Sequence, residues 1–132
     1  MVLHGEIIDL READGWYAVE QDEIIGLITY RVIAGQMEIL SLDSLCERHG
    51  VGTALLNQAV KAARGSKLQR ITLITTNDNL PALRFYQKRG FDMVGLYRNA
   101  VDESRKIKPE IPWFGLDGIP LKHEIELEMK LF

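Results

Sequence analysis

Hydrophobic and polar residues follow one another along this chain in blocks that predict a mixed α/β protein. Three apolar, β-rich segments, Trp16–Glu20, Glu23–Ile33 and Gln36–Leu42, are joined by the two-residue connections Gln21-Asp22 and Ala34-Gly35. Such spacing is typical of an antiparallel meander. Upstream of it, Asp14-Gly15 is a hairpin-turn signal and Glu6–Leu10 is a candidate edge strand.

Two further segments have the apolar spacing of helices that pack on a sheet. The first, Val51–Arg64, has no Asp or Glu in its first turn. The second carries Pro81 in its first turn, where the missing N–H costs nothing, and stops at Gly90. Between the helices, Ile71–Thr75 is apolar and rich in β-branched residues. We expect it to be a buried strand parallel to Gln36–Leu42, because a crossover helix joins the two.

The last third of the chain predicts two strands separated by a long connection. Phe91–Arg98 and Glu124–Phe132 have strand patterns, and the second alternates charged and apolar residues as a strand with one wet face does. The connection, Asn99–His123, holds three of the four prolines of the chain. A connection of this length is usually a functional loop or disordered. Its Trp113 and Phe114 fit either a functional loop or a plug over the core.

Composition and charge then narrow the possible functions. The 132 residues are expected to fold as one domain, residues 1–132, that buries roughly two-thirds of its unfolded surface. The net charge of −3 and the lack of a Lys/Arg block argue against a nucleic-acid partner. No apolar run approaches the roughly 18 residues of a membrane span, and the N-terminus lacks the features of a signal peptide. The single Cys46 excludes an internal disulfide, which fits a cytoplasmic protein, and we expect no metal.

The start of the first predicted helix has the features of a phosphate site. Gly50 and Gly52 leave the backbone bare where a helix has unpaired N–H groups and a positive dipole end. A helix start of this kind, with no carboxylate, suits a phosphate. The glycines would also be explained by a tight turn and close packing of helix on sheet, so this motif alone leaves both readings open.

Two motifs separated by one helix and one strand carry a more specific signal. The first, Glu47–Thr53, reads ERHGVGT, and the second, Asn79–Phe91, reads NLPALRFYQKRGF. In this order they resemble the Q/R-x-x-G-x-G/A loop and the N-x-x-A-x-x-x-Y-x-x-x-G-F segment of the GNAT superfamily of acetyl-CoA-dependent N-acetyltransferases. The resemblance covers about residues 16–99. It implies an α/β (α+β) fold: a mixed, mostly antiparallel twisted sheet with a splayed central parallel strand pair and helices on its faces.

The resemblance also implies acetyl-CoA as the acyl-donor substrate. Backbone N–H groups of the glycine loop would hold its pyrophosphate, and the strand before the loop would pair with the pantetheine arm. A backbone N–H near Leu42 would stabilise the oxyanion that forms from the thioester. Asn79 would bind the arm or cap the helix, and Phe85 would line the arm or pack in the core. The expected acetyl-CoA-binding residues are Leu40, Leu42, Asp43, Arg48, His49, Gly50, Val51, Gly52, Thr53, Asn79, Phe85 and Tyr86.

Tyr86 matches the general acid of the family and would protonate the departing CoA thiolate. The other reading is a buried tyrosine with its hydroxyl at the surface. The attacking primary amine, from a small molecule or a peptide, must lose a proton, and Glu38 is the candidate base, with His123 and His4 as alternatives. Direct attack is favoured over an acetylated Cys46 intermediate.

The chain departs from the family pattern in two places. Glu47 stands where Gln or Arg is usual, and Arg48 is expected to supply the charge instead. The part before Trp16 is short, so one wall of the amine pocket is reduced compared with the family. Either the connection Asn99–His123 or a second subunit replaces that wall, or the pocket is open.

These departures leave two alternatives to an N-acetyltransferase. One is a non-catalytic acyl-CoA-binding module, and the other is an oligomeric structural domain. Because one wall of the amine pocket is reduced and Glu124–Phe132 has the pattern of an edge strand, we expect a homodimer in any case.

Overall fold

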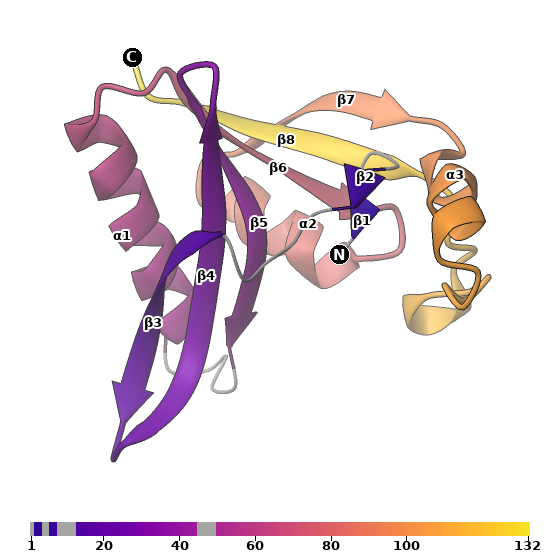
Figure 1. Ribbon diagram of the computed structural model, residues 1–132, viewed down its shortest axis with the longest axis horizontal. Helices are drawn as coiled ribbons and strands as arrows, with labels where there is room; N and C mark the ends of the chain where they lie inside the picture. Colours follow the sequence, from indigo (N-terminus) through magenta and orange to yellow (C-terminus); the bar gives the residue numbers. More distant parts are fainter. Residues whose placement is uncertain (1, 4–5, 8–12, 45–49) are drawn as a thin grey trace. The chain divides into compact units, whose positions relative to one another are not determined.

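The computed structural model describes residues 2–3, 6–7, 13–44 and 50–132 (Figure 1). These fall into two compact units. The meander unit is Leu10–Thr72 with Lys130–Phe132, and the loop unit is Met1–Asp9 with Leu73–Met129. Each is described by itself below, and the expectation of one domain stays a prediction.

The elements alternate as the sequence pattern predicts. In chain order they are β1 (Val2–Leu3), β2 (Glu6–Ile7), β3 (Asp14–Glu20), β4 (Glu23–Ile33), β5 (Gln36–Ser44), α1 (Val51–Gly65), β6 (Arg70–Thr76), α2 (Leu80–Lys88), β7 (Asp92–Tyr97), α3 (Ala100–Ile107), the 3-10 turn η3 (Leu116–Gly118) and β8 (Glu124–Lys130). β1 and β2 form a separate antiparallel pair.

The main sheet has the strand order β3-β4-β5-β6-β8-β7. The pairs β3–β4, β4–β5 and β7–β8 are antiparallel, whereas β5 and β6, joined through α1, form a parallel pair. This confirms the mixed, mostly antiparallel α/β fold expected from the sequence.

The meander unit is held together by α1, which packs on β3, β4 and β5 (Figure 1). The apolar stripe of α1 is buried, as its spacing predicts, through Leu55, Leu56, Ala59 and Ala63. Gly26 in β4 permits the close approach, because a Cβ there would lie 2.7 Å from Cγ1 of Val51. The glycine therefore sets how closely the first turn of α1 approaches the sheet.

The loop unit has its core beside α2 and β8. Leu83 and Tyr86 of α2, Phe91 after it and Leu127 of β8 are all buried. The Tyr86 and Phe91 rings meet edge to face, with their centroids 5.4 Å apart. Aromatic pairs prefer this geometry, so the ring of Tyr86 contributes to packing whatever its hydroxyl does.

One local prediction is wrong, and a second is confirmed for the residues that the structure describes. Asp14-Gly15 is not a hairpin turn, because both residues lie in β3 opposite Tyr30 and Thr29. The polypeptide turns instead between β3 and β4, at Gln21-Asp22, where both φ angles are positive. Of the candidate strand Glu6–Leu10, Glu6 and Ile7 form β2, and the rest lies outside the described residues.

The last strand is not an edge. β8 lies between β6 and β7, and one of its charged residues has a polar partner on β7, since Oε1 of Glu126 accepts a 2.6 Å hydrogen bond from the Tyr97 hydroxyl. The strands at the ends of the sheet are β3 and β7. The predicted homodimer thus loses one of the two observations that motivated it, the edge strand, and stays a prediction.

In the described ranges, no helix is long and apolar enough to cross a membrane. Within the same ranges, no three His, Cys, Asp or Glu side chains are grouped so that they could hold a metal ion.

Candidate active site

The N-terminus of α1 offers open backbone to an anion. Gly50 precedes the helix in the left-handed conformation, with φ 72° and ψ 15°, and no described side chain caps the helix. No described heavy atom lies within 4 Å of the point where a Cβ on Gly50 would sit. The first turn holds no acidic residue. The first N–H groups of an α-helix point toward its N-terminal end, which is also the positive end of its dipole.

The other loop residues of the first motif divide into two groups. Val51 and Gly52 are buried and Thr53 is half-buried in the first turn of α1. Arg48 and His49 lie outside the described residues, as do Cys46 and Glu47. The structure thus describes the helix end of the motif.

β5 carries a β-bulge within the segment expected to meet the pantetheine arm. Thr29 of β4 pairs with Ser41, but the next residue, Tyr30, pairs with Ile39. Leu40, which is buried, is therefore the extra residue on β5. A bulge bends its strand and interrupts the ladder of backbone hydrogen bonds, and bulges are common beside active sites. The sequence pattern gave no sign of this bulge.

The remaining predicted acetyl-CoA-binding residues of β5 both follow that bulge. Leu42 is half-buried and Asp43 is exposed, and they pair with Ile28 and Leu27 of β4.

Glu38, the candidate base, is engaged with an arginine. Its Oε1 accepts a 2.6 Å hydrogen bond from Nε of Arg31, directly opposite on β4. Its side chain is only 15% exposed. Among the alternatives, Nδ1 of His123 accepts a 2.8 Å hydrogen bond from the Asn99 N–H, and His4 lies outside the described residues. The identity of the base stays a prediction.

α2 carries the predicted residues of the loop unit. Oδ1 of Asn79 accepts a 3.2 Å hydrogen bond from the Ala82 N–H, so the predicted helix cap is present and the side-chain amide of Asn79 keeps its donors. Tyr86 is buried and lies seven residues further, about 10 Å along the helix. Phe85 is half-buried, and the guanidinium of Arg89 lies 3.8 Å from its ring centroid.

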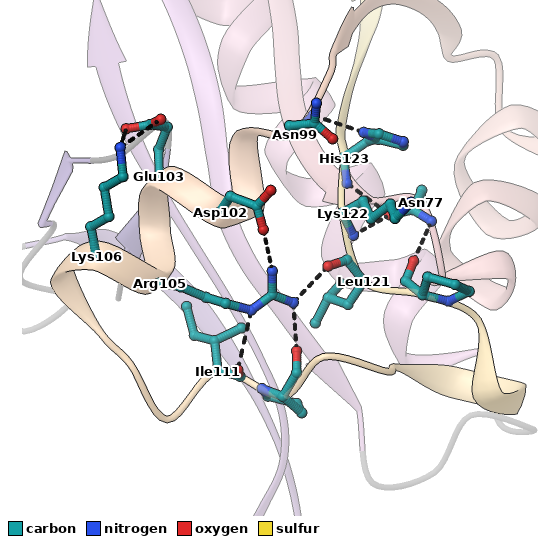
Figure 2. Close-up of polar contacts among 12 residues, drawn as sticks. Asn77, Asn99, Asp102, Glu103, Arg105, Lys106, Ile111, Leu121, Lys122 and His123 are labelled. Carbon is teal, nitrogen blue, oxygen red and sulfur yellow. Dashed lines mark hydrogen bonds and ion pairs between the residues drawn. The ribbon is translucent and has the colours of Figure 1, made fainter.

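The loop of residues 108–123, called here the 108–123 loop, is held by a buried arginine that sequence reasoning missed. Figure 2 shows the guanidinium of Arg105, on α3, directed into this loop. Its side chain is 7% exposed. It donates to the carbonyls of Ile111 (3.3 Å), Pro112 (2.7 Å) and Leu121 (2.6 Å), to Oδ1 of Asp102 (2.7 Å), and it lies 4.2 Å from the ring centroid of Trp113.

Asn77, at the end of β6, fixes the far end of the same loop. Its Oδ1 accepts hydrogen bonds from the N–H groups of Lys122 (3.0 Å) and His123 (2.9 Å), and its Nδ2 donates to the Pro120 carbonyl (2.8 Å; Figure 2). The side-chain amide of an asparagine has an acceptor and two donors, so it can bond the main chain of a peptide segment as a neighbouring strand would.

Asp78, the next residue, is buried and fixes the middle of the 108–123 loop. Its Oδ2 accepts a 3.0 Å hydrogen bond from the Leu116 N–H, and its Oδ1 accepts from the Thr76 hydroxyl. A Cβ on Gly115 would lie 2.0 Å from Oδ2 of Asp78. Only glycine therefore fits beside this carboxylate.

A pocket of about 390 Å³ lies in the loop unit. Its walls are Asp102, Arg105, Trp113, Phe114, Pro120, Leu121 and Lys122. The residues Trp113 and Phe114 are 67% and 64% exposed. The reading of these two residues as a plug over the core is therefore wrong.

The predicted site residues fall into both units. Glu38, Leu40, Leu42, Asp43 and Gly50–Thr53 belong to the meander unit, whereas Asn79, Phe85 and Tyr86 belong to the loop unit. Within the first, the bulge and the open helix end lie on consecutive elements, and within the second, the cap and the tyrosine lie on one helix.

Comparison with known proteins gives a family match. The sequence model of the family described as "Acetyltransferase (GNAT) family" matches residues 3–91. The chain is 48% identical over 126 residues to the uncharacterised protein YdhI of Bacillus subtilis (strain 168), covering 95% of this chain and 79% of YdhI. It is 33% identical over 102 residues to the peptidyl-lysine N-acetyltransferase YjaB of Salmonella typhimurium (strain LT2), covering 76% of this chain and 63% of YjaB.

The fold has solved counterparts. A GNAT family acetyltransferase from Elizabethkingia anophelis with acetyl-CoA bound superimposes with a TM-score of 0.77 and 24% identity, covering 92% of this chain and 78% of that one. At this identity the likeness concerns the fold.

Proposed function

Because this chain belongs to the GNAT acetyltransferase family, we propose that it transfers an acetyl group from acetyl-CoA to a primary amine by direct attack. The observation that carries the proposal is the N-terminus of α1, opened by Gly50 and free of carboxylates. Acetyl-CoA is the donor that the family uses, and a solved fold relative holds it.

The diphosphate of acetyl-CoA fits the helix end. The first backbone N–H groups of an α-helix point toward its N-terminal end, and no described heavy atom lies within 4 Å of the point where a Cβ on Gly50 would sit, so phosphate oxygens can approach there. The helix dipole favours negative charge at this end, so two phosphates bind here more readily than a neutral group.

The bulged strand β5 suits the arm and the thioester. A polar backbone interrupted at Leu40 has groups that a peptide-like pantetheine arm can pair with, as an added strand does. An N–H near Leu42 would donate to the thioester oxygen, where negative charge develops as the amine attacks. The side chain of Asn79 would bind the arm through its free amide donors.

The chemical step needs one acid and one base. The neutral amine attacks the carbonyl carbon, the new C–N bond forms, and the C–S bond breaks. The sulfur leaves as a thiolate and takes the phenolic proton of Tyr86, while the surplus proton of the amine passes to a base. We propose Glu38, whose Oε1 accepts a hydrogen bond from Nε of Arg31, as this base.

Substitution of Tyr86 tests the acid. Tyr86→Phe should lower the rate of CoA thiol release with an amine acceptor tenfold or more, because general-acid assistance is lost. CoA affinity, measured by calorimetry, should be kept. The matched control is Tyr97→Phe, which removes another hydroxyl of the loop unit, one bonded to Glu126. Equal rates in the two variants would remove Tyr86 from the mechanism.

The same assays separate the alternatives. A non-catalytic acyl-CoA-binding module would be stabilised by CoA but would release no thiol with any amine. An oligomeric structural domain would show neither effect, and light scattering would then report its assembly.

A further inference from the structure

The pocket of the loop unit is large enough for a small molecule. Its volume of about 390 Å³ falls within the range of ligand sites, roughly 300–1,000 Å³. The diphosphate and the arm of acetyl-CoA were assigned above to α1, β5 and Asn79, none of which lines this pocket. The pocket therefore has no assigned ligand.

Two aromatic rings face solvent at this pocket. Trp113 and Phe114 are each about two-thirds exposed, although exposed apolar surface costs roughly 25 cal/mol per Å² relative to burial. Arg105 covers one face of the Trp113 ring from 4.2 Å. A flat apolar group in the pocket would cover more of these rings and recover that free energy.

The walls are fixed before any ligand arrives. Arg105 and Asn77 bond main-chain groups of the 108–123 loop (Figure 2), and Asp78 accepts a hydrogen bond from the Leu116 N–H of the same loop. A ligand therefore would not have to order the loop, and binding avoids that entropic cost. Such anchoring is expected of a binding site more than of a mobile lid.

The charges at the pocket do not cancel. Asp102 is paired with Arg105 at 2.7 Å, so these two offset each other. Lys122 also lines the pocket, and in the described part of the chain its ammonium forms no ion pair. Its backbone is fixed because its N–H donates to Asn77. The uncompensated ammonium favours a ligand that carries an anionic group.

The pocket is also joined to the proposed catalytic helix. Asn77 and Asp78, which hold the 108–123 loop, directly precede Asn79, the cap of α2. Tyr86 lies on that helix. The residues that anchor the pocket wall are thus adjacent in sequence to the helix that carries the proposed acid.

We propose that this pocket binds the acyl acceptor and selects a small amine that carries both a flat apolar group and a carboxylate, as aromatic amino acids do. The ring would contact Trp113 and Phe114, and the carboxylate would pair with Lys122. This inference rests on the proposed function, because it names the acceptor of that reaction. It disfavours lysine side chains of proteins, whose positive charge Lys122 repels.

Three amines test the two contacts separately. Phenylalanine has ring and carboxylate, phenethylamine lacks the carboxylate, and alanine lacks the ring. For the intact protein, kcat/KM for thiol release should be about tenfold or more higher with phenylalanine than with either analogue, the scale of one charge-assisted contact or one stacked ring. Lys122→Gln should abolish the preference over phenethylamine, and Trp113→Ala should abolish the preference over alanine.

A matched variant controls for charge. Lys106→Gln removes an exposed lysine that pairs with Glu103 on α3 and does not line the pocket, so both preferences should persist. Preferences unchanged by Lys122→Gln and Trp113→Ala, or faster transfer to a lysine-containing peptide than to phenylalanine, would overturn the inference.

Direct binding distinguishes failure of the inference from failure of the proposed function. Calorimetry without CoA should detect phenylalanine binding that weakens about tenfold in Lys122→Gln. Binding of this kind without any thiol release would support the pocket and contradict the proposed reaction. Thiol release with other amines but no phenylalanine binding would support the proposed reaction and contradict the assignment of the pocket.

Discussion

The N-terminus of α1 and the 108–123 loop are both prepared to hold a ligand, but they are prepared in opposite ways. At α1 the backbone is accessible because Gly50 has no side chain and no described side chain caps the helix. In the loop the side chains of Arg105, Asn77 and Asp78 are bonded to the main chain. The first site needs little more than local sequence, whereas the second needs partners far apart in the chain.

The comparison predicts the largest loss of stability at Arg105. Arg105→Ala leaves three loop carbonyls and the Asp102 carboxylate without their donor. The free energy of unfolding, measured by urea denaturation, should fall by about 3 kcal/mol. Arg105→Lys should recover less than half of this loss, because one ammonium does not reproduce the fork of the guanidinium.

Arg84 provides the control for this variant, since it is an exposed arginine on α2. Arg84→Ala should change the free energy of unfolding by less than about 0.5 kcal/mol. If the two alanine variants were equally stable, the loop would not depend on its buried arginine and the contrast between the two sites would fail.

The second prediction concerns the bare helix end. Gly50→Asp would place a carboxylate where the diphosphate is proposed to bind, and the Kd for CoA should rise about tenfold or more through charge repulsion. Gly35→Asp is the matched control, because Gly35 has φ 75° against 72° for Gly50 and the space around both is open. Backbone strain is therefore similar in the two variants, and calorimetry with CoA isolates the effect of position.

Stability should move in the other direction. An aspartate at the N-cap accepts a hydrogen bond from the first turn of the helix, so Gly50→Asp should be at least as stable to urea as Gly35→Asp. Equal CoA affinity in the two glycine variants would mean that the open helix end is only a turn.

Features of the fold and of the candidate site that depend on neighbouring residues could be predicted from the sequence, and features that depend on distant residues could not. The apolar stripe of α1, the glycine helix start and the cap at Asn79 all depend on residues close together in the chain, and all three were predicted. The charged residues of β8 wrongly suggested an edge strand. The partner of Glu126 is Tyr97 on another strand, and the sequence pattern of β8 alone does not reveal it. Arg105 was missed because its acceptors are backbone carbonyls, which every residue carries.

The bulge at Leu40 escaped prediction for a related reason. A bulge is a shift between two strands, and only the pairing with Thr29 and Tyr30 reveals it. Side-chain alternation along β5 reports which face a residue occupies, and it gives no information about register with β4.

A third prediction separates the two roles of the Asn79 side chain, which caps α2 and is proposed to bind the pantetheine arm. Asn79→Ala removes the helix cap and should lower the free energy of unfolding by about 1 kcal/mol. Asn79→Asp keeps an oxygen acceptor for the Ala82 N–H and should be nearly as stable as the parent protein. Both variants lose the amide donors, so both should bind CoA more weakly. Unchanged CoA affinity in Asn79→Asp would leave the side chain with its capping role alone.

The smallest effect on stability is expected from Tyr30→Phe. This variant tests whether ionisation of a side chain in the meander unit affects stability or CoA affinity. Tyr30 stacks on Trp16 with ring centroids 4.9 Å apart. Burial, and then the nearby charge of Asp14, raise the pKa of Tyr30 above its ordinary value of 10.0.

A raised pKa means that the folded protein keeps the phenolic proton longer than the unfolded chain does. The resulting stability is fully present below pH 10, the ordinary pKa, and is lost as the pH rises through the folded value. The difference in unfolding free energy between the parent protein and Tyr30→Phe should therefore be constant from about pH 7 to pH 9 and shrink above about pH 10. CoA affinity should be the same in both proteins below pH 10, since the proposed diphosphate site uses backbone donors. A CoA affinity that followed Tyr30 at neutral pH would show that a side chain takes part where we infer only backbone.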